Sequence, residues 1–331
     1  ENLFKVKVTD YWNLTSKRNG IAHSLDNVPN PVNVTSVTYD LESMTIIWED
    51  YVPNLSRINQ MNQNTRSTVT NDFVSYELLQ SDTEDGTYTS VTVITDQSTT
   101  SHSLTEYDPT HENWFKVKVT DFWELNSTGS GMTNSIDLEP NPVNVTSVTY
   151  DLSEMVVTWG QSNDNDFVSY ELLQSDSENG TYSSVIVITD QTTTSHSLTE
   201  YDPTMENWFK VKVTDFWGLN STGSEMTNEI DSPPTPSEIY PIESDNGSFI
   251  ISWSQNNESD FLSYTLYQSQ YGDMSDQSIV ITINDNIDTS TIISDDLGYF
   301  QINTQDIWGQ ESESNIIGTT NIISGIMYIV G

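Results

Sequence analysis

The sequence contains no cysteine and few basic residues. The absence of cysteine excludes disulfide frameworks, thiolate zinc sites and cysteine nucleophiles, but it does not fix the cellular compartment. Lys and Arg together number 10 against 49 Asp and Glu, which gives a formal net charge of −39. Binding nucleic acid requires cations placed against phosphates, and so acidic a surface repels them. Nucleic acid is therefore excluded as a partner, whereas counter-ions such as calcium are compatible.

The chain also lacks long apolar runs, and Ala is scarce. No segment reaches the roughly 20 apolar residues that a membrane-spanning helix needs, so we expect no membrane insertion in this segment. Ser, Thr, Asn and Asp are abundant, which favours strands and turns over helices. The first residue is Glu1 rather than Met, and we expect a mature or partial chain.

Internal repeats determine the architecture. The phrase NDFVSYELLQSD occurs at 71–82 and 165–176, and SDFLSYTLYQSQ follows at 259–270, so each copy begins 94 residues after the one before it. PNPVNVTSVTYDL occurs at 29–41 and again 111 residues later, so the first repeat carries an insertion near 51–68. The phrase ENLFKVKVTDYW begins at residue 1 and returns as ENWFKVKVTDFW at 112 and 206. The chain is therefore an array of similar units.

Each unit alternates apolar and polar residues with a period of two between turn residues, which is typical of half-buried strands. For one unit the pattern predicts seven strands, at 143–150, 154–159, 167–174, 184–189, 195–199, 208–214 and 225–230. Seven short strands in about 94 residues predict an all-β, two-sheet sandwich of immunoglobulin size. Units of that size can each bury a core of their own.

Three further features resemble bacterial fibronectin type III repeats. A Trp closes the second strand at Trp48, Trp159 and Trp253, and the phrase F-x-x-Y-x-L follows. The sixth strand alternates apolar residues and ends in Asp and a turn. The resemblance implies tandem fibronectin type III-like sandwiches. It departs from the family at Phe115 and Phe209, where the family has Tyr, so another group must hold that corner.

The repeat register sets the expected domain boundaries. Residues 1–27 hold the last two strands of a unit, and complete repeats occupy 28–137, 138–231 and 232–318, followed by a tail at 319–331. Prolines lie at the joints and stiffen short linkers, so we expect the repeats to form a semi-rigid rod. Because residues 1–27 lack the earlier strands of their unit, we also expect the chain to belong to a longer repetitive polypeptide.

No pattern of catalytic residues emerges, and we predict no catalytic site. A catalytic histidine needs a base or nucleophile held beside it. His102 and His196 take the same place in successive repeats, and no such partner recurs beside them. Zincin, nucleophile-elbow and dinucleotide-binding motifs are absent.

The sixth strand carries the most regular surface pattern. If its apolar residues point inward, a Trp and two Lys point outward in each of two repeats: Trp114, Lys116, Lys118, Trp208, Lys210 and Lys212. We call these six residues the Trp–Lys stripe. It could contact a polysaccharide or the acidic face of another protein. The alternative is that the lysines neutralise acids on adjacent strands of their own sheet.

An acidic loop after Trp159 is the candidate calcium site. It reads S-N-D-N-D and places Asp164 and Asp166 at alternate positions, as the hard oxygen ligands of calcium require. The alternative is a solvated turn in which Asn and Asp cap their own backbone. No other cofactor is expected.

Together these features predict a non-catalytic structural or adhesive repeat protein, extracellular or at the cell surface. It would serve as a spacer or as a subunit of a surface filament or stalk, with copies of itself or neighbouring repeats as partners. The alternative is a glycan- or protein-binding module of a larger secreted protein or hydrolase. Fold alone does not decide between them.

Overall fold

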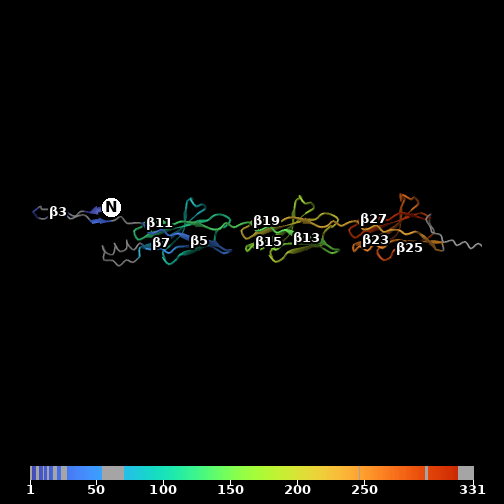
Figure 1. Ribbon diagram of the computed structural model, residues 1–331, viewed down its shortest axis with the longest axis horizontal. Helices are drawn as coiled ribbons and strands as arrows, with labels where there is room; N and C mark the ends of the chain where they lie inside the picture. Colours follow the sequence, from blue (N-terminus) through green and yellow to red (C-terminus); the bar gives the residue numbers. More distant parts are fainter. Residues whose placement is uncertain are drawn as a thin grey trace, which may run out of the picture. The chain divides into compact units, whose positions relative to one another are not determined.

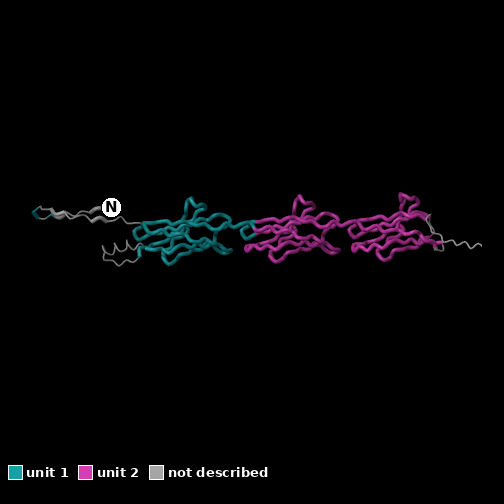
Figure 2. Tube along the Cα trace, in the orientation of Figure 1, with its two compact units in different colours: residues 1–139, 215–219 teal, residues 140–214, 220–331 magenta. Residues whose placement is uncertain are grey.

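A computed structural model describes residues 2–4, 7–9, 11–12, 15–17, 21–23, 28–53, 71–245, 247–294 and 297–319. Its regular secondary structure within these residues is β-strand (Figure 1). None of the described residues forms a helix long and apolar enough to cross a membrane. By compactness the chain divides into a first unit of residues 1–139 and 215–219, and a second of residues 140–214 and 220–331 (Figure 2). The predicted insertion near 51–68 and the predicted tail at 319–331 lie almost wholly outside the described residues.

The first unit contains a sandwich of two antiparallel sheets, called here the first sandwich. The smaller sheet has the order β5–β6–β9, formed by Val34–Tyr39, Met44–Trp48 and Ser101–Leu104. The larger has the order β8–β7–β10–β11, formed by Thr89–Ile94, Phe73–Ser81, Trp114–Asp121 and Asn126–Thr128, and β12 (Met132–Thr133) also pairs with β10. Three strands packed on four make an immunoglobulin-like sandwich.

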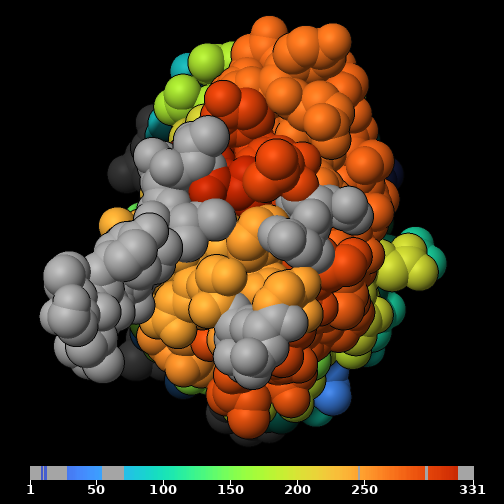
Figure 3. All heavy atoms as spheres, turned by 90° about the vertical axis from the view of Figure 1, so that its right-hand side faces the viewer, coloured from blue at the N-terminus to red at the C-terminus, as the bar shows by residue number. Residues whose placement is uncertain are grey.

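The second and third sandwiches repeat this strand order. The second has β13 (Val145–Tyr150), β14 (Met155–Trp159) and β17 (Ser195–Leu198) in one sheet, and β16 (Ser183–Ile188), β15 (Phe167–Ser175), β18 (Trp208–Asp215), β19 (Asn220–Thr222) and β20 (Met226–Thr227) in the other. The third has β21 (Glu243–Asp245), β22 (Ser248–Ser252) and β25 (Ser290–Ser294), and β24 (Ser278–Ile283), β23 (Phe261–Ser269), β26 (Tyr299–Asp306), β27 (Glu311–Glu313) and β28 (Ile317–Gly318). Its close-packed atoms are orange and red in Figure 3. The predicted all-β fold of tandem fibronectin type III-like sandwiches is confirmed.

One predicted strand of the second sandwich needs correction. The first six lie within two residues of their predicted bounds, but the last, predicted at 225–230, is only Met226–Thr227. A separate strand, β19, precedes it and pairs with β18. The short segment Asn220–Thr222 is polar throughout, so hydrophobic alternation could not reveal it.

A separate hydrophobic core fills each sandwich. In β10 the inward residues Phe115, Val117 and Val119 are fully buried, while the residues between them are half-buried, as the two-residue period of a strand requires. The predicted Trp positions are buried in all three cores, at Trp48, Trp159 and Trp253. Each of these rings packs edge-to-face on a buried Tyr of the neighbouring sheet.

The corner left without its usual Tyr is held by other groups. The hydroxyl of Tyr201, in the loop before β18, donates a hydrogen bond to the backbone carbonyl of Asp151. The buried amide of Asn228 donates to the carbonyls of Pro203 and Met205 in the same loop. In the first sandwich Tyr107 bonds the carbonyl of Asp40 in the same manner. In both sandwiches a tyrosine hydroxyl of the loop thus provides the hydrogen bond that Phe115 and Phe209 cannot make.

Short strands precede the first sandwich. β1 (Asn2–Phe4) pairs with β4 (Ile21–His23), and β2 (Lys7–Thr9) pairs with β3 (Thr15–Lys17). Both pairings are antiparallel, as a hairpin made of the last two strands of a repeat requires.

Candidate functional site

The lysines of the Trp–Lys stripe contact groups of their own sandwich. In β10, Lys118 forms an ion pair with Glu77 of the adjacent strand. Lys116 lies 4.3 Å from the ring centroid of Tyr88 and donates to the backbone carbonyl of Glu84 at 3.3 Å. The hydrogen bond from Lys118 is the largest influence that lowers the pKa of Glu77. Lys118 is therefore neutralised by an acid of its own sheet, while Lys116 is held by a ring face and a backbone carbonyl.

The second sandwich repeats these contacts. Lys212 forms an ion pair with Glu171. Lys210 lies 4.4 Å from the ring centroid of Tyr182, and its Nζ is 3.4 Å from a carboxylate oxygen of Glu225. The ion pairs of Lys118, Lys210 and Lys212 match the alternative that the lysines neutralise acids of their own sheet, while a ligand for the stripe stays a prediction.

The two tryptophans of the stripe are held in fixed orientations. The indole Nε1 of Trp114 donates to the carboxylate of Glu112 at 2.9 Å, and Trp208 donates to Glu206 at the same distance. Both rings are half-buried. These hydrogen bonds restrict the rotation of each ring, which lowers the entropic cost of a contact there.

The predicted calcium loop is organised by its own side chains. Asp164 accepts a hydrogen bond from the hydroxyl of Ser162 at 2.8 Å, and its backbone carbonyl accepts one from the amide of Gln191 at 2.7 Å. Such contacts are those of a capped turn. Asp166 is half-buried and lies directly before β15. Calcium binding by Asp164 and Asp166 stays a prediction.

A second group of acidic residues lies within the second unit, and none of its members was predicted as a site residue. One carboxylate oxygen from each of Asp231, Asp260 and Asp306 lies within 4.8 Å of the other two. Burial and then the charges of Asp231, Asp306 and Glu258 raise the pKa of Asp260. A proton or a hard cation would relieve this repulsion.

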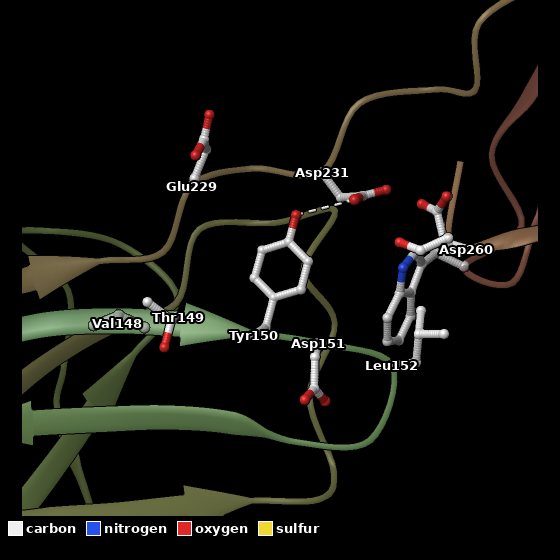
Figure 4. A pocket seen from close by; sticks show the side chains of 10 residues that line it. Val148, Thr149, Tyr150, Asp151, Leu152, Glu229, Asp231 and Asp260 are labelled. Carbon is white, nitrogen blue, oxygen red and sulfur yellow. Dashed lines mark hydrogen bonds between the residues drawn. The ribbon is translucent and has the colours of Figure 1, made fainter. Parts of the chain in front are cut away.

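Two of these residues, Asp231 and Asp260, border a cleft between the second and third sandwiches, with a volume of about 530 Å³ (Figure 4). Tyr150 stands in its centre and points its hydroxyl at Asp231, with an O–O distance of 3.0 Å. Burial and this hydrogen bond raise the pKa of Tyr150 to about 12, so the phenol stays protonated and acts as a donor. Trp308 lines the cleft from the third sandwich, and its ring centroid is 5.3 Å from that of Tyr201.

The sequence contained a signal for these residues. Asp260 occupies the position of the predicted ligand Asp166, 94 residues further on. Asp306 is the last residue of the sixth strand, as Asp121 and Asp215 are in the earlier repeats, and Asp231 matches Asp137. Recurrence alone could have selected them. Their proximity could not be seen, because it depends on how a linker, a loop and a strand end converge.

Comparison with known proteins does not assign this chain to a family. No protein-family model matches the sequence, and no curated protein matches it. Among solved structures, the FN1–FN3 domains of chicken CNTN1 align over 88% of this chain and 97% of that one, at 12% identity and a TM-score of 0.25. At that level the similarity does not support a functional assignment. The fold therefore rests on the sheets and cores described above.

Proposed function

We propose that this chain is a non-catalytic, extracellular spacer that serves in a surface filament or stalk. The observation that carries the proposal is the contact between the second and third sandwiches. Trp308 packs on Tyr201, and Gln310 donates a hydrogen bond to Asp231 at 2.8 Å. Side chains of this kind restrict the angle between two domains, whereas free relative motion is the usual behaviour of domains with small interfaces. A fixed angle is what a spacer needs.

Partners in such an assembly would be copies of this chain or neighbouring repeats. Two surfaces this acidic repel one another unless protons or divalent cations intervene. Association of copies should therefore depend on divalent cations, of which calcium is the natural candidate.

Electron microscopy of the native material, with and without a chelator, tests the proposal. Rods or filaments that shorten or separate on chelation would support it. Isolated particles under all conditions would contradict a filament or stalk. Labelling of intact source cells with an antibody tests the extracellular location, and signal that appears only after permeabilisation would contradict it.

A second candidate function is contact with a polysaccharide or a protein through the Trp–Lys stripe. The oriented rings of Trp114 and Trp208 favour it, since flat aromatic faces stack on sugar rings. Binding to a glycan array should fall when both are changed to Ala. Phe216→Ala is the matched control, because Phe216 is an exposed aromatic residue outside the stripe. Equal binding by wild type and the double variant would exclude this role for the stripe.

A further inference from the structure

The turn that follows β26 holds two side chains in fixed positions. Asp306 is fully buried, and its Oδ1 accepts hydrogen bonds from the backbone amides of Trp308 at 2.9 Å and Gln310 at 2.8 Å. Gly309 between them has a φ of 88°, a conformation that glycine adopts without strain. The Trp308 ring and the Gln310 amide therefore project from one pinned turn.

These two side chains meet a matching surface on the second sandwich. The Nε2 of Gln310 donates to Oδ2 of Asp231 at 2.8 Å, and more weakly to Oδ2 of Asp306 at 3.4 Å. Tyr150 donates to the other oxygen of Asp231. Asp231 thus accepts one hydrogen bond from the second sandwich and one from the third. A carboxylate between two donors binds a carboxamide well and an alkyl group poorly.

The residue that provides the second donor distinguishes this turn from its counterparts. The matching turns read D-F-W-E-L at 121–125 and D-F-W-G-L at 215–219, whereas the third sandwich reads D-I-W-G-Q at 306–310. The Trp is common to all three, but the position of Gln310 is Leu in the other two. A leucine there has no donor for Asp231.

We propose that Gln310 is the determinant of this joint: its carboxamide completes the hydrogen bonds of Asp231, which the leucine at the same position of the other two turns cannot do. The common Trp provides the apolar contact, and the carboxamide distinguishes the third sandwich from a copy of the first or second. The joint between the second and third sandwiches then has a hydrogen bond that a copy of the first or second sandwich in the third place would lack. This inference rests on the proposed spacer function, because only a fixed joint makes the identity of the neighbour matter.

Spin labels on the full chain test the inference. The chain has no cysteine, so Asn179→Cys in the second sandwich and Gln277→Cys in the third give two labelled sites, both exposed. Pulsed electron resonance then reports the distribution of distances across the joint. We expect a narrow distribution for the labelled parent and a distribution about twofold broader for Gln310→Leu, since domains without a specific joint move relative to each other. Asp231→Ala should broaden it equally, and the two changes together should add little.

Gln305→Leu is the matched control. It removes an amide that bonds Glu311 at 3.2 Å within the third sandwich, away from the second, and the distribution should stay narrow. Gln310→Glu keeps the shape of Gln310 but places a charge against Asp231, so it should broaden the distribution near neutral pH and narrow it on acidification. It serves in place of Gln310→Leu if circular dichroism shows that the leucine variant is unfolded.

The outcomes separate this inference from the proposed function. A broad distribution in the labelled parent would contradict the fixed joint, and the spacer function with it. A narrow parent with equally narrow Gln310→Leu and Gln310→Glu variants would overturn the inference while leaving the spacer function standing.

Discussion

The second and third sandwiches share a strand order and a buried Trp, but they differ on the outer face of the larger sheet. In the second, Lys212 pairs with Glu171 across adjacent strands. In the third, the matching residues are Asn303 and Thr265, which are also direct cross-strand partners. Lysine and glutamate have thus been replaced together. Where the lysine is absent, its acidic partner is absent too, which indicates that the two residues act as a pair. The buried residues of the two cores, in contrast, keep the same pattern in both sandwiches.

The largest expected effect concerns the buried Trp, which the two sandwiches share. Trp159→Ala and Trp253→Ala should each cost about 3–5 kcal/mol of unfolding free energy, because each empties the space of a buried ring. Since the two cores are separate clusters, each change should lower only the transition of its own sandwich. Urea unfolding followed by residue-resolved NMR measures this. A single transition that shifts equally in both variants would show that the cores are not independent.

A phenylalanine control sharpens the interpretation. The indole nitrogens of Trp159 and Trp253 have no hydrogen-bond partner among the described residues. Replacement by Phe should therefore lose only volume and cost clearly less than Ala. An equal cost would mean that the N–H groups contribute to stability.

A smaller effect extends the comparison to the first sandwich. The residue after the turn Trp has a positive φ in all three sandwiches, and it is Gly218, Gly309 and, at φ 63°, Glu124. A side chain in this conformation costs about 1–2 kcal/mol. Glu124→Gly should therefore stabilise the first sandwich by about 0.5–1 kcal/mol, after allowance for the entropy of glycine. Thermal unfolding of the variant measures it, and destabilisation would contradict the strain.

The exchange of charged for neutral pairs should have a still smaller effect. Glu171→Thr and Lys212→Asn should each destabilise the second sandwich, while the double variant, which copies the third, should lie closer to wild type. The expected coupling energy is about 0.5 kcal/mol, because both side chains are partly exposed. Lys212 lowers the pKa of Glu171, so this coupling is present above the ordinary value of 4.5 and is lost as pH falls through the lowered value. Coupling that is unchanged in acid would contradict the ion pair.

The smallest expected effect has the opposite dependence on pH and belongs to the third sandwich. The pKa of Asp260 is raised from its ordinary value of 3.8, chiefly by burial. The protonated side chain of Asp260 therefore stabilises the fold fully below pH 3.8, and this stabilisation is lost as the pH rises through the raised pKa. Asp260→Asn should therefore raise the melting temperature near pH 7 and have no effect at pH 3. Destabilisation near pH 7 would show that the ionised carboxylate is useful, as a bound cation would make it.

The sandwiches could be predicted well because a strand with one buried face alternates apolar and polar residues, and this local pattern ends at turn residues. Repetition added the register, and the Trp of each core marked the second strand. β19 escaped because its three residues are polar. The joint escaped for a different reason: Tyr150, Asp231 and Gln310 are each unremarkable in their own segment, and only packing of two sandwiches places their polar atoms together.

The buried aspartate at the end of the sixth strand has a consequence for how such arrays evolve. Asp121, Asp215 and Asp306 each fix their turn through backbone amides, which any residue provides. The side chain two residues after the Trp is therefore not needed for the conformation of the turn. Leucine and glutamine occupy it on the same backbone. A single nucleotide change can convert a leucine codon into a glutamine codon, so a duplicated sandwich can gain a hydrogen bond to the sandwich before it in one mutational step, without a change in its own fold.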